Sequence, residues 1–257
     1  MFNPEGVGIH FRRTTSAGVA LVELLVGLAI AAVAIGAAMA SLRVASGAAV
    51  TVSELAQLHQ DASHAMRVLG QQTRMVGSNE LQASATGRFR FVVGEAASES
   101  STSVHGEDGS VGSSDSVRLI HTSPPLLLSQ QVDCLGQGVA PGLPVEATFQ
   151  VDSRGNLQCK GTAPKAQPLI SGVATFKLRY RVRQGNQVRS LLAAEVEAAG
   201  LWRAVTALES CLELQGGARS AAAEAIYTDC EDRSIGTGGR LKLVRRKLFV
   251  VNAQASA

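Results

Sequence analysis

Residues 16–30 read SAGVALVELLVGLAI and open an apolar run that continues to residue 40. Between residues 19 and 40 the only charged side chain is Glu23. A helix of about 20 apolar residues is long enough to cross a bilayer. Arg12 and Arg13 precede the run, whereas Arg43 is the only basic residue close behind it. We therefore predict a membrane-spanning helix over residues 19–42, with its N-terminus in the cytoplasm and the rest of the chain translocated.

Glu23 is the unusual residue of this run. A carboxylate within a membrane span costs roughly 2.5–3.5 kcal/mol, which makes it a functional-site hypothesis that needs a partner. If the chain is cleaved after Gly18, Val19 supplies a new α-amine one helical turn away from Glu23. The amine and the carboxylate could then pair, either within one chain or between neighbouring chains.

The N-terminal residues resemble the class III signal of type IV pilins and type II secretion pseudopilins. The resemblance rests on Gly18, four apolar residues, Glu23 and then Leu24-Leu25-Val26. It implies that a prepilin peptidase cleaves between Gly18 and Val19 and methylates the new amine. It also implies an assembly role for Glu23. Val19 stands where the family usually has Phe.

Two other interpretations of the apolar run stay open. One is a secretory signal cleaved at Ala38-Met39-Ala40, and the other is an ordinary signal anchor. The run is long for a signal peptide, whose apolar region spans about 7–15 residues. Neither interpretation explains Glu23.

The helical pattern continues beyond the membrane-spanning segment. Apolar residues recur at helical spacing, with polar residues between them: Val52, Leu55, Leu58, Ala62, Ala65, Leu69 and Val76. No proline lies between residues 19 and 76, and Gly77 is a suitable stop signal. We predict one helix over residues 19–77, apolar on all sides at first and then amphipathic, so that one stripe packs on a domain.

The remainder favours β-structure. Residues 78–116 are rich in Ser and Gly and are predicted to be a connecting loop, with one short strand at 88–93. Residues 117–257 are predicted to form an antiparallel sheet without intervening helices. Its predicted elements are a hairpin at 147–160 and strands at 173–182, 204–214 and 241–251. The fold class is therefore α+β, a long helix packed on an antiparallel sheet.

All four cysteines, Cys134, Cys159, Cys211 and Cys230, follow the apolar run. An even number in a translocated domain predicts two disulfides and an oxidising compartment such as the periplasm. Three pairings are possible, of which Cys134–Cys159 with Cys211–Cys230 is the most economical. A disulfide that closes a loop of this length typically stabilises a domain by about 3 kcal/mol. A metal site is disfavoured because no C-x2-C spacing is present.

Composition and motifs argue against nucleic-acid binding and catalysis. The formal charge is only +3, and the basic cluster at residues 240–247 alternates with leucines, which favours one exposed strand face over a nucleic-acid site. No G-x-S-x-G, H-E-x-x-H or phosphate-binding glycine loop is present. We predict no catalytic residue, no metal site and no cofactor.

The isolated polar and aromatic residues have ordinary interpretations. His59 and His64 lie five apart on the predicted helix, off a shared face. His121 is predicted to be a surface or rim residue, and Glu195 and Glu197 to lie on the solvated side of a strand. Trp202 is predicted to lie in the core, with a partner contact as the alternative.

Six later segments, in chain order, resemble PilW-type minor type IV pilins, which are similar to J-type pseudopilins of type II secretion. The segments are residues 65–77, 114–118, 133–136, 155–159, 167–173 and 227–230. The resemblance implies a pilin-like fold and a subunit that primes type IV pilus assembly with other minor pilins.

The partners it implies are other minor pilins and the major pilin, through the N-terminal helix, and the prepilin peptidase. The implied location is the inner membrane, single-pass with the C-terminal domain in the periplasm, and then the pilus. A type II secretion pseudopilin and a membrane-anchored adhesive or binding module remain alternatives.

Overall fold

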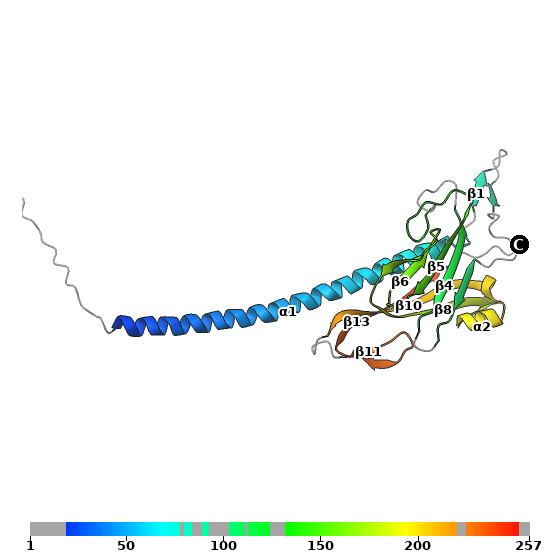
Figure 1. The fold of residues 1–257 in the computed structure, drawn as a ribbon. Helices are drawn as coiled ribbons and strands as arrows, with labels where there is room; N and C mark the ends of the chain where they lie inside the picture. The colour runs from blue at the N-terminus through cyan, green and yellow to red at the C-terminus, as the bar shows by residue number, and fades with distance from the viewer. Residues whose placement is uncertain are drawn as a thin grey trace, which may run out of the picture. The chain divides into compact units, whose positions relative to one another are not determined.

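The computed structural model describes residues 19–77, 80–83, 89–92, 103–110, 113–123, 132–219 and 225–251 (Figure 1). The chain divides into two compact units, residues 1–53 and residues 54–257. The predicted leader, residues 1–18 with Gly18, lies outside the described residues.

Helix α1 spans Val19–Met75. In the second unit its turns bury one stripe, as the amphipathic pattern predicts. The buried apolar residues of this stripe are Leu58, Ala62, Ala65, Met66 and Leu69. The helix ends two residues before Gly77, whose φ of +68° belongs to the left-handed conformation that commonly ends helices.

The first of two larger sheets has five antiparallel strands in chain order. They are β3 (Val104–Glu107), β4 (Ser116–Thr122), β5 (Pro144–Val151), β6 (Leu157–Lys160) and β7 (Gln167–Ile170). Alternate residues face the core, and Val117, Leu119 and Phe149 are fully buried. The hairpin predicted at residues 147–160 is confirmed as β5 and β6.

The second sheet has four antiparallel strands in the order β13-β10-β8-β9. They are β8 (Val173–Gln184), β9 (Gln187–Leu191), β10 (Val205–Arg219) and β13 (Arg240–Val250). The strands predicted at 173–182, 204–214 and 241–251 are confirmed as β8, β10 and β13. Because side chains alternate along a strand, every second residue of β8 from Phe176 to Val182 is buried.

The amphipathic part of α1 packs against this second sheet. Gly70 on α1 faces the ring of Phe249 on β13 so closely that a Cβ at position 70 would overlap the ring. Nearby, the Ser210 hydroxyl on β10 donates to Met66 Sδ at 3.3 Å. Residues from α1 and from both sheets belong to one hydrophobic cluster. The predicted α+β class, with a helix on antiparallel strands, is therefore confirmed.

Two smaller antiparallel pairs complete the described strands: β1 (Glu80–Ala83) with β2 (Phe89–Val92), and β11 (Ile226–Thr228) with β12 (Ser234–Gly236). Strand β2 matches the short strand predicted at 88–93. The prediction of a connecting loop up to residue 116 is wrong at β3, because Val104–Glu107 pairs with β4 and Val104 is fully buried.

Two further predictions need correction. The β-structure forms two separate larger sheets, and helices α2 (Ala193–Ala198) and η2 (Trp202–Ala204) lie between β9 and β10. Glu195 and Glu197 therefore lie on a helix and not on a strand. Helix α2 forms because Ala193 and Val196 bury one face, and the Asp108 carboxylate accepts hydrogen bonds from the Ala193 and Ala194 amides.

Candidate functional site

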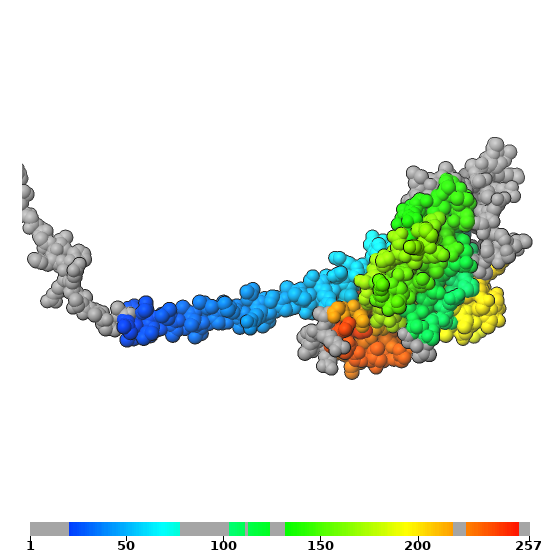
Figure 2. Space-filling view, in the orientation of Figure 1, coloured from blue at the N-terminus to red at the C-terminus, as the bar shows by residue number. Residues whose placement is uncertain are grey.

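The first unit consists of an exposed apolar stretch of α1. Every described side chain from residue 21 to residue 53 is exposed, including Leu21 at 63%, Ile30 at 66% and Val33 at 74% (Figure 2, blue). Among the described residues, one helix is long and apolar enough to cross a membrane, and the mean hydropathy of its most apolar window is 2.4. Apolar surface is unfavourable in water, and this stretch has the length and composition of a membrane anchor.

Glu23 lies on this exposed stretch, near its start. It is the only acidic residue between residues 19 and 53, and Arg43 is the only basic one. Helix α1 begins at Val19, four residues before Glu23, and residues four apart are neighbours on a helix surface. The cleavage site at Gly18 lies outside the described residues, so the processing of Gly18 and Val19 remains a prediction.

Three glycines interrupt the apolar surface: Gly27, Gly36 and Gly47. A Cβ added at any of them would meet no atom within 4 Å. Small residues on membrane helices let a second helix approach closely. The stretch therefore has the composition and the free surface needed for packing against other helices.

Both disulfides of the predicted sequential pairing are present: Cys134–Cys159 and Cys211–Cys230. Cys134 lies in a turn, and Cys159 lies on β6 of the five-stranded sheet. Cys230 lies in the turn between β11 and β12, which the second bridge ties to Cys211 on β10.

Each of the turn cysteines follows an aspartate that organises its turn. The Asp133 carboxylate accepts hydrogen bonds from the amides of Leu135 and Gln137, both at 2.9 Å, and from the Thr162 hydroxyl at 2.6 Å. Burial raises the pKa of Asp133, but these hydrogen bonds outweigh burial, so the pKa lies below its usual value.

Asp229 repeats this arrangement in the β11–β12 hairpin. Its carboxylate accepts from the amides of Glu231 and Arg233, and from the Arg233 guanidinium at 2.9 Å. Burial raises the pKa of Asp229, but the hydrogen bonds from Arg233 and Glu231 lower it below its usual value. Asp152 organises a third turn in the same way, through the amides of Arg154 and Asn156.

Charged residues attach the β11–β12 hairpin to the four-stranded sheet. Lys177 on β8 lies 3.9 Å from Glu231, and Arg246 on β13 lies 2.6 Å from Asp232. Arg246 also donates to the backbone carbonyl of Asp229. The basic side chains of the sheet therefore bind the acidic side chains of the hairpin.

A buried ion pair continues this contact. Lys242 Nζ on β13 lies 3.0 Å from Glu213 Oε1 on β10, and the Tyr227 hydroxyl donates to the same carboxylate oxygen. Burial, followed by the Glu213 contact, raises the pKa of Tyr227. The prediction that the basic residues at 240–247 form one exposed face is wrong for Lys242, whose side chain is only 12% exposed.

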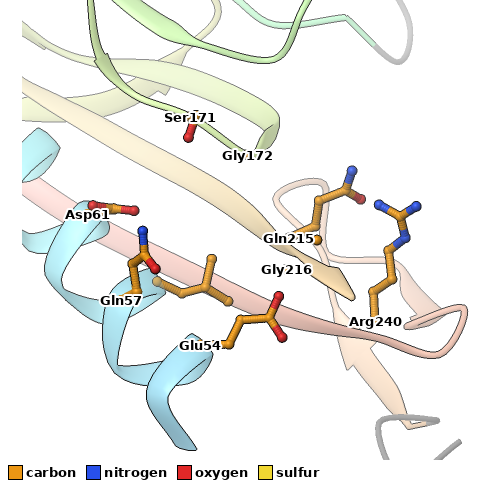
Figure 3. Close-up of a pocket in the computed structure, with 10 residues that line it drawn as sticks. Glu54, Gln57, Asp61, Ser171, Gly172, Gln215, Gly216 and Arg240 are labelled. Atoms are coloured by element: carbon orange, nitrogen blue, oxygen red, sulfur yellow. The ribbon is translucent and has the colours of Figure 1, made fainter. Parts of the chain in front are cut away.

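A polar cleft of about 280 Å³ lies in the second unit, between α1 and the ends of the sheet strands (Figure 3). Glu54, Gln57 and Asp61 form the α1 wall, and Gln215 and Arg240 lie opposite. The cleft contains carboxylates and a guanidinium but no His, Cys or Ser–His pair suited to catalysis.

The remaining candidates are not brought together into a reactive site. Among the described residues no group of three or more His, Cys, Asp and Glu side chains is placed to hold a metal ion. His59 and His64 are exposed on α1. The prediction that His121 is a surface or rim residue is wrong, because His121 is 4% exposed and shares the core-facing side of β4 with Leu119.

Trp202 lies in the core, as predicted, with 5% of its surface exposed. The centroids of the Trp202 and Tyr180 rings lie 5.0 Å apart in a T-shaped arrangement, and Trp202 Nε1 donates to the Glu197 carboxylate. Glu197 is therefore a structural partner of Trp202.

Comparison with known proteins finds a likeness among solved structures but none at the level of sequence. No protein-family model matches the sequence, and no curated protein matches it. Among solved structures, a type IV-like pilin from Thermus thermophilus is similar, with 15% sequence identity and a TM-score of 0.46, over 77% of this chain and 97% of that one.

Sequence reasoning missed a buried carboxylate of the second unit, Asp115. Asp115 is 3% exposed, and its carboxylate accepts from the Leu178 amide at 2.7 Å and from Lys177 Nζ at 3.2 Å. No local pattern marks these contacts, because Lys177 and Leu178 follow Asp115 by 62 and 63 positions in the sequence. The Asp-turns had a visible signal, because the dipeptide Asp-Cys occurs at both Asp133 and Asp229.

Proposed function

We propose that the chain is a type IV pilin-related subunit, and more specifically a minor pilin that primes pilus assembly together with other minor pilins. The observation that carries the proposal is the stretch from residue 21 to residue 53, a helix whose side chains are all exposed and almost all apolar. The class III signal around Gly18 and Glu23 supports it.

The proposed mechanism has a membrane stage and an assembly stage. The exposed stretch of α1 first resides in the inner membrane, while residues 54–257 fold in the periplasm, where both disulfides form. Cleavage after Gly18 then frees the amine of Val19. Helices of neighbouring subunits replace lipid around α1 as the subunit enters the filament.

In the proposal, Glu23 makes the transfer of α1 from lipid into the filament favourable by pairing with a neighbouring subunit. A carboxylate among apolar helices is strongly unfavourable unless it is paired, and removing one partner of a buried pair commonly costs about 3–5 kcal/mol. The α-amine of a neighbouring subunit's Val19 is a suitable partner. Pairing would fix the stagger between adjacent helices.

The N-terminus of the mature protein provides the decisive measurement. We expect mass spectrometry of the protein from its native cells to find a chain that begins at N-methylated Val19. Deletion of the prepilin peptidase should leave residues 1–18 attached. A chain beginning at Ser41 would instead support a secretory signal, and a retained Met1 in the presence of the peptidase would support a signal anchor; either result contradicts the proposal.

Deletion of the gene separates the pilus from the secretion alternative. A minor pilin that primes assembly should, when deleted, reduce the number of surface pili and leave type II secretion intact. Normal piliation with loss of secretion would assign the chain to the pseudopilins.

A further inference from the structure

The four-stranded sheet has an outer face, opposite the core. Phe176, Leu178, Tyr180 and Val182 of β8 point into the core, so the residues that follow each of them point outward. On β8 these are Lys177, Arg179, Arg181 and Arg183. Successive guanidinium groups on one face of a strand are about 6.8 Å apart along it.

Strand register extends this face into rows. Lys177, Cys211 and Arg246 lie side by side across β8, β10 and β13. In the next row along β8, Arg179, Glu209 and Leu248 are neighbours. In the row after that, Ser190 of β9, Arg181, Ala207 and Val250 are neighbours.

The β11–β12 hairpin covers the first of these rows. Cys211 is bonded to Cys230 of the hairpin, Lys177 lies 3.9 Å from Glu231, and Arg246 lies 2.6 Å from Asp232. The molecule thus shows how an acidic hairpin binds to this sheet: carboxylates meet the outward lysine and arginine side chains.

The following rows also carry outward basic side chains, but the β11–β12 hairpin does not cover them. The open face comprises Arg179, Arg181, Arg183, Glu209, Leu248 and Val250. The three arginines are exposed, Leu248 is 46% exposed and Val250 is 64% exposed. The open face carries three guanidinium groups and only one carboxylate, that of Glu209. Its Oε2 lies 3.8 Å from Arg181 Nε. Among the described residues, Arg179 and Arg183 form no ion pair.

We propose that the open face is a docking surface for an acidic strand or hairpin of a partner protein, which continues the arrangement already made by the β11–β12 hairpin. The partner's carboxylates would alternate along an extended segment, so that their spacing matches that of the arginines on β8. The apolar groups at one side of the face, Leu248 and Val250, would be covered by apolar side chains of the same partner.

Charge selects this partner over a second copy of the chain. Two open faces brought together by a two-fold axis would place arginines against arginines, and like charges directly opposite are unfavourable. The apolar border at Leu248 and Val250 favours a protein over a purely anionic polymer or a lipid headgroup layer. This surface is separate from the exposed stretch of α1, and its test does not use pilus assembly as the readout.

The experiment measures peptide binding to the full chain in detergent micelles. The probe is a fluorescent peptide of four Glu-Thr repeats, and the matched probe has four Gln-Thr repeats. One variant carries Arg179→Gln, Arg181→Gln and Arg183→Gln. A control variant with the same loss of charge carries Arg154→Gln, Lys160→Gln and Lys165→Gln, three exposed residues on β6 and in the connections on either side of it. A double variant, Arg179→Gln with Arg183→Gln, keeps the Arg181–Glu209 pair in case the triple variant does not fold.

We expect the Glu-Thr probe to bind wild type and the control variant equally, and the triple variant about tenfold more weakly, since exposed charge contacts are individually modest. Binding should weaken as salt rises, and the Gln-Thr probe should not bind. Equal binding to the triple and control variants would overturn the proposal. Preferential binding of an oligothymidylate, or of phosphatidylglycerol vesicles over phosphatidylcholine vesicles, would also overturn it and assign the face to an anionic polymer or to a membrane.

Discussion

Lys242 and Glu213 form an ion pair at 3.0 Å, in which the side chains are only 12% and 5% exposed. The Tyr227 hydroxyl donates to the Glu213 carboxylate, and Lys242 Nζ donates to the Gln215 amide oxygen. A buried pair of this kind is costly to break, because the remaining charge keeps its desolvation penalty without its partner.

We therefore expect Lys242→Met to lower the free energy of unfolding by about 3–5 kcal/mol. Urea unfolding followed by the fluorescence of Trp202, the single tryptophan, measures this. Lys165→Met removes an exposed lysine and should change stability by less than about 0.5 kcal/mol. Equal losses in the two variants would show that the buried pair contributes nothing specific.

The close approach of α1 to the sheet gives a second prediction. Gly70 faces the Phe249 ring with no room for a Cβ, so Gly70→Ala should lower stability by about 1–3 kcal/mol through overpacking, despite the better helix propensity of alanine. Gly138→Ala is the matched control, since a Cβ there would meet nothing within 4 Å. Thermal unfolding of the two variants makes the comparison, and a Gly70→Ala protein as stable as wild type would contradict the close packing.

The pH dependence of stability should report the Asp133 turn. The folded-state pKa of Asp133 is lowered, so its contribution is present above the unfolded pKa of about 3.9 and is lost as pH falls through the folded value. Wild type should therefore lose stability as pH falls below about 4, and Asp133→Asn should show a shallower loss.

Glu146→Gln serves as the control for this series. The half-exposed Glu146 side chain has two long contacts, to Arg118 at 3.9 Å and to the Thr148 hydroxyl at 3.4 Å, so its replacement should change the stability measured at low pH much less than Asp133→Asn does. An unchanged acid limb in Asp133→Asn would remove the turn as a source of the pH dependence.

Replacement of Glu23 tests the proposed assembly step. Glu23→Ala should leave the protein folded and inserted in the membrane but should reduce its incorporation into filaments, because the neighbouring amine loses its partner. Immunoblots of sheared filaments and of membranes measure the two pools. Ser41→Ala on the same helix controls for substitution as such. Incorporation of Glu23→Ala at wild-type efficiency would refute the pairing.

Local patterns allowed much of the fold to be predicted. Periodicity located α1 and the strands β8, β10 and β13, because burial of one face imposes a repeat on the sequence. The pattern failed at residues 193–198. There the Asp108 carboxylate, 85 positions away from Ala193, accepts hydrogen bonds from the first amides of the short helix. A tertiary contact of this kind leaves no signal in the local sequence.

The candidate site divides in the same way. Gly18, Val19 and Glu23 were predicted from a short local motif, and their roles are still predictions. The open face was not predicted, because it combines residues of two strands that are far apart in sequence. Arg179 and Arg181 share a surface with Leu248 and Val250 only because β8 and β13 both pair with β10. Register between strands far apart in sequence decides which side chains share a surface.

The repeated Asp-turn has a consequence for how the chain tolerates change. In each turn the aspartate, two backbone amides and one residue with positive φ lie within five consecutive positions, and that residue is Gly136, Gly155 or Asp232. Both turn cysteines are therefore oriented by their immediate neighbours. Insertions and deletions between the turns can accumulate without altering which sulfurs meet, so the outer loops are free to diversify while the covalent frame stays the same.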